Sequence, residues 1–255
     1  RCPTTAADPK GACRVLTHHD EGDVAIITLN RPDRRNALNV ELCDMLGETI
    51  HAKVARGSRA IVITGEGSAF CSGADLDAVY GDAFLTSLYG MFAKIRSAPM
   101  PVIAAVNGPA IGAGTQLALA CDLRVADERA VFAVPTARNG LVVDVWTIRR
   151  LTDLAGGGPA RRLLLGAGQL DRDEALQCGL VDHAGPTSDA IEWAAEIAAY
   201  APMSLAFSKK VLNNPDLPDD DEELRAEFLA CFASEDVAEG RRARSEKRAP
   251  RFTGR

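Results

Sequence analysis

At 255 residues, of which 47% are apolar, the chain is long enough to form one substantial globular domain around its own hydrophobic core. Its formal net charge of −6 argues against a general nucleic-acid binder. No apolar run approaches the length of a membrane span, so we expect no transmembrane segment.

The cysteines and histidines form no recognisable metal or disulfide pattern. The seven cysteines are scattered, which in a chain of this length indicates reduced thiols and a cytoplasmic protein. Residues 1–20 also lack the pattern of a secretory signal. Cys71 lies in a glycine-rich motif, but no histidine is near it in sequence, so we interpret it as a small buried residue. We expect no bound metal.

In the first part of the chain, predicted strands and helices alternate. Residues 1–13 are expected to form a flexible leader. A hairpin turn at 21–23 precedes the first strong strand, and Asn39 can cap the helix that follows. The predicted strands are 24–29, 60–64, 102–106, 123–126 and 131–134, and the predicted helices begin near residues 40, 83 and 115.

From about Gly156 the pattern becomes mostly helical. Pro159 can begin one helix, Asp171 can cap another, and Gly179 can end it. A third helix is expected at 190–197. The acidic run at 219–223 and the basic tail at 241–255 are interpreted as solvated helix faces and an arm, and disorder of this arm is one alternative. Apolar strands alternating with helices predict an α/β fold with a mainly parallel sheet covered on both faces.

The segment Asn107–Gln116 is the most informative part of the sequence. It follows the apolar run 102–106, and a strand, a glycine-rich turn and a helix start meet at Gly112–Gly114. Small residues there let another molecule approach the backbone, and the first amides of a helix have no internal partner. Such a place can hold a developing negative charge.

Five motifs in this order and spacing make the chain resemble the enoyl-CoA hydratase/isomerase (crotonase) family from about residue 22 onward. The motifs are Arg35-Asn-Ala-Leu38, Ala69-Phe-Cys-Ser-Gly-Ala-Asp-Leu76, Asn107 through Gly114, Cys121-Asp-Leu-Arg124, and 175–181. The resemblance implies a spiral of ββα units over 14–190, and a helical trimerisation region with a basic tail over 191–255. It also implies trimers or pairs of trimers, no permanently bound cofactor, and a coenzyme A thioester as the ligand in fatty acid metabolism.

The resemblance also assigns individual residues. The main-chain NH groups of Ala74 and Ala113 match the pair that grips the thioester carbonyl, and two such donors are each worth roughly 3 kcal/mol. The remaining matches lie along the coenzyme A moiety, although a capped loop explains Arg35, Ala37 and Leu38 equally well. The residues expected to bind coenzyme A are Arg35, Ala37, Leu38, Gly73, Asp75, Leu76 and Phe252.

Hydratases of this family use two glutamates, and this chain has Gln116 and Thr136 at the matching positions. Neither side chain can act as a general base near neutral pH, although both can form hydrogen bonds. Asp144 matches an aspartate found in related isomerases. Its apolar neighbours Val142, Val143, Val145 and Trp146 predict a poorly solvated acid suited to proton transfer. A helix cap, or an ion pair with Arg149 or Arg150, is the structural alternative.

Three functions therefore stay open. The first is an acyl-CoA binder or carrier with weak or absent hydratase chemistry. The second is an active hydratase or isomerase that uses Asp144 as its acid and base. The third is a dinucleotide-binding dehydrogenase with Gly65-Glu-Gly67 after a strand, which Phe70 disfavours because a small residue is needed there. Residues 77–95 are expected to border the acyl chain, and Phe252 with its neighbouring arginines is expected to approach a ligand in an adjacent subunit.

Overall fold

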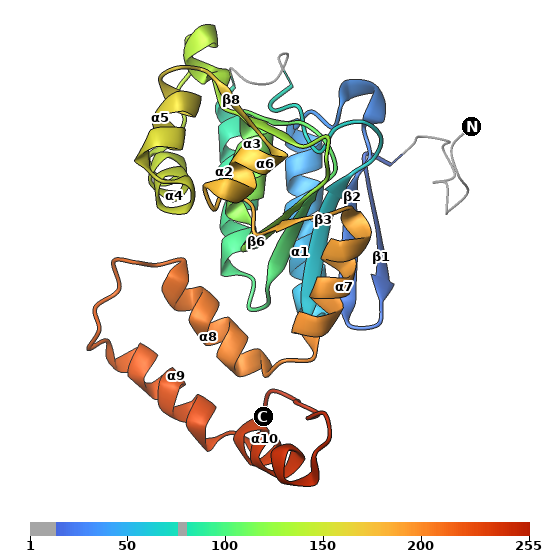
Figure 1. Cartoon of the computed structure of the whole chain (residues 1–255), viewed down its shortest axis with the longest axis vertical. Helices are drawn as coiled ribbons and strands as arrows, with labels where there is room; N and C mark the ends of the chain where they lie inside the picture. The colour runs from blue at the N-terminus through green and yellow to red at the C-terminus, as the bar shows by residue number, and fades with distance from the viewer. Residues whose placement is uncertain (1–13, 76–80) are drawn as a thin grey trace.

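The computed structural model describes residues 14–75 and 81–255. Its main sheet has six strands in the order β1-β2-β3-β4-β6-β9, and the β1–β2 hairpin is antiparallel while the other pairs are parallel. The α/β class and the mainly parallel sheet are therefore confirmed (Figure 1). The strands are β1 (Leu16–Glu21), β2 (Val24–Leu29), β3 (Ala60–Gly65), β4 (Val102–Val106), β6 (Leu123–Ala126) and β9 (His183–Ala184).

A second, three-stranded sheet was not expected from the sequence. It has the order β5-β7-β8, in which the two-residue strand β5 pairs with β7 and β7 also pairs with β8. Because a strand this short carries no periodicity, only its partners identify it. Its strands are β5 (Ala110–Ile111), β7 (Val131–Ala133) and β8 (Gln169–Asp171).

Ten α-helices are present in the described parts of the chain, besides two short 3-10 helices at Pro32–Arg34 and Pro135–Asn139. Asn39 caps α1 by accepting from the NH of Leu42, and Asp171 forms a capping box with Glu174 at α6, both as expected. Pro159 is the third residue of α5 rather than its first, since the helix begins at Gly157. The helices are α1 (Val40–Ala55), α2 (Asp82–Ser97), α3 (Ala113–Ala120), α4 (Val145–Ala155), α5 (Gly157–Leu164), α6 (Arg172–Gln177), α7 (Thr187–Ala198), α8 (Pro202–Leu212), α9 (Glu222–Ala233) and α10 (Glu235–Glu246).

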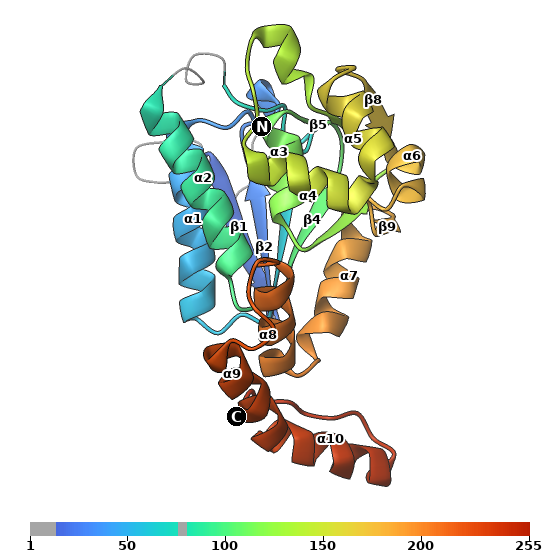
Figure 2. The same ribbon diagram turned by 90° about the vertical axis from the view of Figure 1, so that its left-hand side faces the viewer.

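The central strands bury both faces because successive side chains point to opposite sides of the sheet. In β3, Ile61 and Ile63 pack in the larger core with α1, α2 and α3, whereas Ala60 and Val62 pack in a second core with α7. Figure 2 shows α1 and α2 on one side of the sheet and α7 on the other. This arrangement explains why these strands are apolar throughout rather than alternating.

The last three helices extend away from the sheet (Figures 1 and 2). Lys209 on α8 anchors them, because its buried ammonium donates to the carbonyls of Ile95 and Met100 at 2.9 Å each. The same ammonium lies 2.7 Å from Asp122 Oδ2. No residue of α9 is buried, and Phe228, Leu229 and Phe232 on this helix are exposed.

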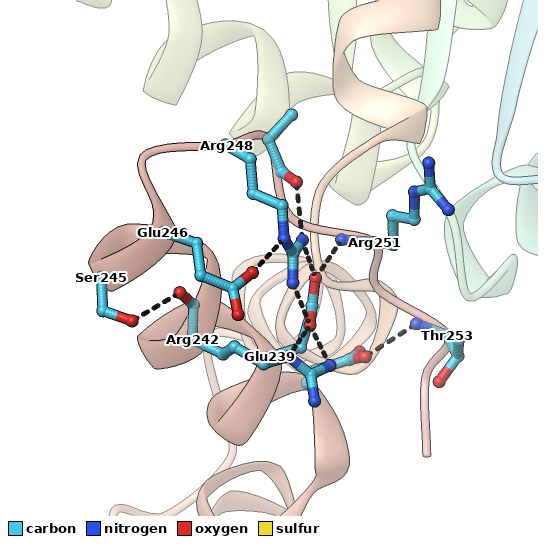
Figure 3. Close-up of polar contacts among 9 residues, drawn as sticks. Glu239, Arg242, Ser245, Glu246, Arg248, Arg251 and Thr253 are labelled. Carbon is cyan, nitrogen blue, oxygen red and sulfur yellow. Dashed lines mark hydrogen bonds and ion pairs between the residues drawn. The ribbon is translucent and has the colours of Figure 1, made fainter.

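The basic tail is ordered, so the alternative of a disordered arm is wrong. After α10 the chain folds back, and Asp236 accepts from the NH groups of Thr253 and Gly254 at 2.7 and 2.9 Å. Glu239 makes most of the contacts that hold this returning segment. It binds Arg242 and Arg248 and accepts from the NH of Arg251 (Figure 3). Two buried carboxylates thus hold the tail in place. In the sequence, the tail is recognisable only as a run of basic residues.

Candidate functional site: two free amides at one cavity

A parallel β-bridge fixes the direction of the Ala74 amide. Leu38 donates its NH to the Gly73 carbonyl at 2.8 Å and accepts from the NH of Asp75 at 2.7 Å. Since both neighbours of Ala74 face Leu38, the NH of Ala74 must face the opposite way, because alternate peptide groups of a strand point to opposite sides. Within the described chain, this NH has no hydrogen-bond partner.

The Ala113 NH also has no partner in the described parts of the chain, because Ala113 is the first residue of α3 and no earlier turn of the helix supplies a carbonyl. The turn before it is held firmly, because the NH of Gly112 donates to Ala133 and the Thr115 hydroxyl donates to Ala110 and Ala133. Gly112 has φ of +55°, a conformation that favours glycine. The positive end of the helix dipole thus lies beside the free NH.

The two free amides lie close together. A Cβ placed on Gly73, the residue bonded to Ala74, would be 3.7 Å from the nitrogen of Ala113. Ala74 and Ala113 both line one cavity of about 350 Å³, together with Gly73, Gln116 and Thr136. The fold therefore brings five of the predicted site residues together at this cavity. A larger hollow of about 540 Å³ between the end of α2 and α8–α9 contains neither alanine, so we place the site in the smaller cavity.

The apolar part of this cavity comes from α2 and from the segment before α4. Leu85, Leu88 and Tyr89 of the predicted 77–95 stretch line it, whereas Phe92 is core only. Leu85 is 43% exposed and Val142 84% exposed, so the cavity opens onto the surface at this end. Leu76 and residues 77–80 lie outside the described residues.

Of the described residues assigned to coenzyme A, Gly73 alone lines this cavity. Leu38 is fully buried and Ala37 nearly so, while Arg35 is exposed with φ of +48°. Asp75 accepts a charged hydrogen bond from Arg31 at 2.9 Å. Phe252 packs beside Gly240 of α10. The helix α10 and the C-terminus lie far from α4 in the molecule (Figure 1).

Asn36 and Arg31 are supporting residues that sequence reasoning missed. The buried Asn36 side chain donates to the carbonyls of Glu66 and Ala69 and accepts from the NH of Arg31. It therefore ties the loop before α1 to the loop that carries Ala74. The sequence did contain a signal for Asn36, which lies inside the motif Arg35-Asn-Ala-Leu38. The φ of Asn36 is +57°, a left-handed conformation that asparagine tolerates better than most residues.

Asp144 lies one layer behind the cavity wall. It occupies the N-cap position of α4, yet its side chain makes no capping hydrogen bond. Its Oδ1 accepts instead from Gln116 Nε2 at 3.4 Å and from the hydroxyl of Thr147. Thr147 was also missed, although its spacing of three residues from Asp144 on a helix was a usable signal.

The solvation expected for Asp144 was wrong in part. Val142 and Val145 are largely exposed and Asp144 is half-buried, because the turn before α4 lies at the surface. No ion pair to Arg149 or Arg150 occurs within the described ranges.

The titrating groups near Asp144 are Arg96 and Tyr89. The guanidinium of Arg96 lies 4.5 Å from the centre of the Trp146 ring; burial lowers the pKa of Arg96, and Asp144 opposes this. Burial raises the pKa of Tyr89, and the charge of Asp144 raises it further, while the amide of Gln116 lowers it.

Cys71 is buried beneath the site, as the sequence indicated. Burial raises the pKa of its thiol to about 12, so it is protonated at neutral pH and is no nucleophile. Among the described residues, no group of three potential metal ligands occurs, and no helix is long and apolar enough to cross a bilayer. The chain after Gly67 continues through Phe70 to a bridge at Cys71 rather than into a helix, unlike a dinucleotide-binding turn.

The arrangement of strands, turns and free amides agrees with comparisons to known proteins. The profile of the enoyl-CoA hydratase/isomerase family matches residues 19–255. The chain belongs to this family. A relative from Mycobacterium tuberculosis described as probable enoyl-CoA hydratase echA6 is 45% identical over 236 residues, covering 91% of this chain and 96% of the relative. The 2,3-dehydroadipyl-CoA hydratase of Escherichia coli is 34% identical, covering 91% of this chain and 96% of that protein.

Solved structures of the enoyl-CoA hydratase/isomerase family share the whole fold. A crystal structure described as a putative enoyl-CoA hydratase from Streptomyces coelicolor A3(2) has a TM-score of 0.87 at 34% identity and covers 100% of both chains. A family protein from Hyphomonas neptunium has a TM-score of 0.87 at 32% identity, covering 95% of this chain and 98% of its own. The crotonase fold expected from the motifs is therefore confirmed.

Proposed function

We propose that this protein binds fatty acyl-CoA thioesters and that its hydratase chemistry is weak or absent. The observation that carries the proposal is that the NH groups of Ala74 and Ala113, which have no partner among the described residues, lie at one cavity. A thioester carbonyl oxygen can accept from both at once, and donors fixed in advance lose little free energy to reorganisation. Relatives named for CoA thioester hydration support the same ligand class.

The weak chemistry follows from the side chains opposite these amides. Gln116 and Thr136 line the cavity where hydratases of the family carry glutamates. Addition of water to an enoyl group needs a base to take a proton from water, and neither an amide nor an aliphatic alcohol does this near neutral pH. A site that binds the thioester but has no general base would act as a carrier, which holds acyl-CoA or presents it to other enzymes.

The alternative is an active hydratase or isomerase that uses Asp144 as its acid and base. The hydrogen bond from Gln116 to Asp144 favours it, because it links the carboxylate to the cavity wall. Against it, Asp144 is separated from the cavity by Gln116 and does not line it. A general base must come within hydrogen-bond reach of its proton, directly or through one water.

Surface features support two further inferences, one on the length of the acyl chain and one on the subunit assembly. The opening at Leu85 and Val142 accommodates an acyl chain longer than the cavity. The exposed Phe228, Leu229 and Phe232 on α9 favour burial between subunits of a homotrimer or a dimer of trimers. In that assembly Phe252 and the arginines of 241–255 would approach a neighbour's coenzyme A. No permanent cofactor is required, and a cytoplasmic location stays an expectation.

Calorimetry with acyl-CoAs of graded chain length, beside an absorbance assay for loss of the enoyl group, tests the proposal. We expect affinity that rises with chain length and negligible turnover. Turnover like that of an ordinary hydratase would contradict it, and turnover abolished by Asp144→Asn would select the alternative. Affinity for acyl-CoA no greater than for free coenzyme A would reject both.

A further inference from the structure

The basic tail, residues 241–255, is strongly positive in an acidic protein. It holds seven lysines and arginines and one glutamate, whereas the whole chain carries a formal net charge of −6. Arg242 and Arg248 pair with Glu239, and Arg248 also pairs with Glu246. The other cations of the tail are exposed and form no ion pair with another described residue; they are Arg241, Arg244, Lys247, Arg251 and Arg255.

These unpaired cations belong to an ordered surface. Asp236 and Glu239 hold the returning chain by its main-chain NH groups. Figure 3 shows the side chain of Arg251 pointing away from Glu239, although its NH is bonded to that residue. Arg241 and Arg244 lie three residues apart on α10, so they are neighbours on the helix surface. Cations on an ordered segment lose less conformational freedom on binding than those of a mobile one.

The acidic run, residues 219–223, is a surface of opposite charge. Asp221 is occupied as the cap of α9, because it accepts from the NH of Leu224 at 2.9 Å. Glu223 lies 3.1 Å from the ammonium of Lys210. The remaining acids are exposed and pair with no cation in the described chain; they are Asp219, Asp220 and Glu222.

The helix α9 separates the two charged surfaces within one chain. It has 12 residues and is therefore about 18 Å long, with the acidic run at its start and α10 after its end (Figures 1 and 2). Between them lie the exposed Phe228, Leu229 and Phe232, and the rings of Phe228 and Phe232 are 4.8 Å apart. An apolar centre with charged groups around it is the composition of a protein–protein interface.

We propose that the basic tail of one copy of this chain binds the acidic run of another copy, chiefly through Arg241 and Arg244. The inference rests on the homotrimer of the proposed function and names the surfaces that join its subunits. In a ring of three, each copy binds one neighbour through its basic tail and the other through its acidic run. Contacts of tail with tail, or of run with run, are disfavoured because they bring like charges together.

The remaining cations have a separate place in this assembly. Arg251 and Arg255 lie on either side of Phe252 in the sequence. They therefore stay available to a neighbour's coenzyme A, while Arg241 and Arg244 join the subunits.

Sedimentation velocity of the full chain over a range of protein concentrations tests the pairing with three variants. One reverses the tail (Arg241→Glu with Arg244→Glu), one reverses the run (Asp219→Lys with Asp220→Lys), and the third combines all four substitutions. We expect each reversal alone to raise the dissociation constant of the subunits at least tenfold, because it brings like charges into contact. The combined variant should recover most of the wild-type affinity.

Salt and a matched variant serve as controls. Raising sodium chloride from about 0.1 M to about 1 M should weaken the wild-type assembly, since the screening length falls from about 10 Å to about 3 Å. Arg14→Glu with Arg161→Glu changes the net charge by the same amount as the tail reversal. Both arginines are exposed and form no ion pair within the described ranges, so assembly should be unchanged. Thermal unfolding checks that every variant is folded.

Three results would overturn the inference: a wild type that stays monomeric, reversal variants that assemble like the wild type, or a combined variant that does not recover. Binding of the wild type to phosphatidylglycerol vesicles, with assembly insensitive to both reversals, would instead assign the basic tail to a lipid surface. Calorimetry on the same wild-type protein separates the proposed function from these outcomes. Affinity for acyl-CoA above that for free coenzyme A leaves acyl-CoA binding intact even if the pairing fails.

Discussion

Gly73 and Ile111 lie so close that a Cβ on Gly73 would be 2.8 Å from the carbonyl oxygen of Ile111. Through this contact, the loop that carries Ala74 meets the strand that leads to Ala113. The φ of Gly73 is +105°, which a residue with a side chain rarely adopts. The spacing of the two free amides therefore depends on the absence of a single methyl group.

Gly73→Ala should weaken acyl-CoA binding by at least tenfold, because the two loops must move apart by several tenths of an ångström. Calorimetry with one saturated acyl-CoA measures this. Gly90→Ala is the matched control: Gly90 is exposed within α2, a Cβ there meets nothing within 4 Å, and the change should stabilise the helix by about 0.5–1 kcal/mol. Undiminished affinity in Gly73→Ala would contradict the role of the paired amides.

Lys209→Met should lower the free energy of unfolding by about 3 kcal/mol, because it removes the cation that pairs with the Asp122 carboxylate and leaves two carbonyls without this donor. Urea unfolding followed by circular dichroism measures this. The neighbouring Lys210 pairs with Glu223 and Glu227 at the surface, so Lys210→Met should change stability far less. Equal effects of the two substitutions would show that the anchoring of α8 is not specific to Lys209.

Glu239→Gln should destabilise the protein at neutral pH but not in acid. Arg248, the NH of Arg251 and Arg242 hold the pKa of Glu239 well below its ordinary value of 4.5. Because the folded-state pKa is below the unfolded one, the stabilisation is complete above the unfolded value and is lost as pH falls through the folded value.

The difference in melting temperature between wild type and Glu239→Gln should thus be constant from about pH 7 to 6 and should shrink below about pH 4. Glu246→Gln is the control, since Glu246 is more exposed and binds only Arg248. A difference that persists unchanged into acid would mean that the Glu239 charge does not hold the tail.

Native thiol labelling should discriminate strongly among the described cysteines. Burial raises the pKa of Cys43, Cys71 and Cys121 to about 12 each, so their thiolates are scarce at pH 8. Cys178 and Cys231 are only half-buried and should react with iodoacetamide first, as peptide mass spectrometry would report. Early labelling of Cys71 would mean that the loop carrying Ala74 opens readily.

The sequence by itself determined the features that local chemistry specifies. The strands β4 and β6 have the predicted bounds, because apolar runs between turn residues fix where a buried strand begins and ends. The caps at Asn39 and Asp171 were likewise readable, since each acts on an NH three residues away. The glycines that allow close approach at Ala74 and Ala113 were also visible as motifs.

Only the tertiary structure decided how distant segments meet. The bridge that turns the Ala74 NH toward the cavity joins two residues 36 positions apart, Leu38 and Ala74. The Gln116 amide is hydrogen-bonded to Thr147 on another helix. The basic tail is ordered by Asp236 and Glu239, two carboxylates that lie before the basic run and outside the acidic one. Hydrogen bonds between residues far apart in the chain produce no periodic pattern in the sequence. Their geometry exists only after the core has packed, so they cannot be predicted from local sequence.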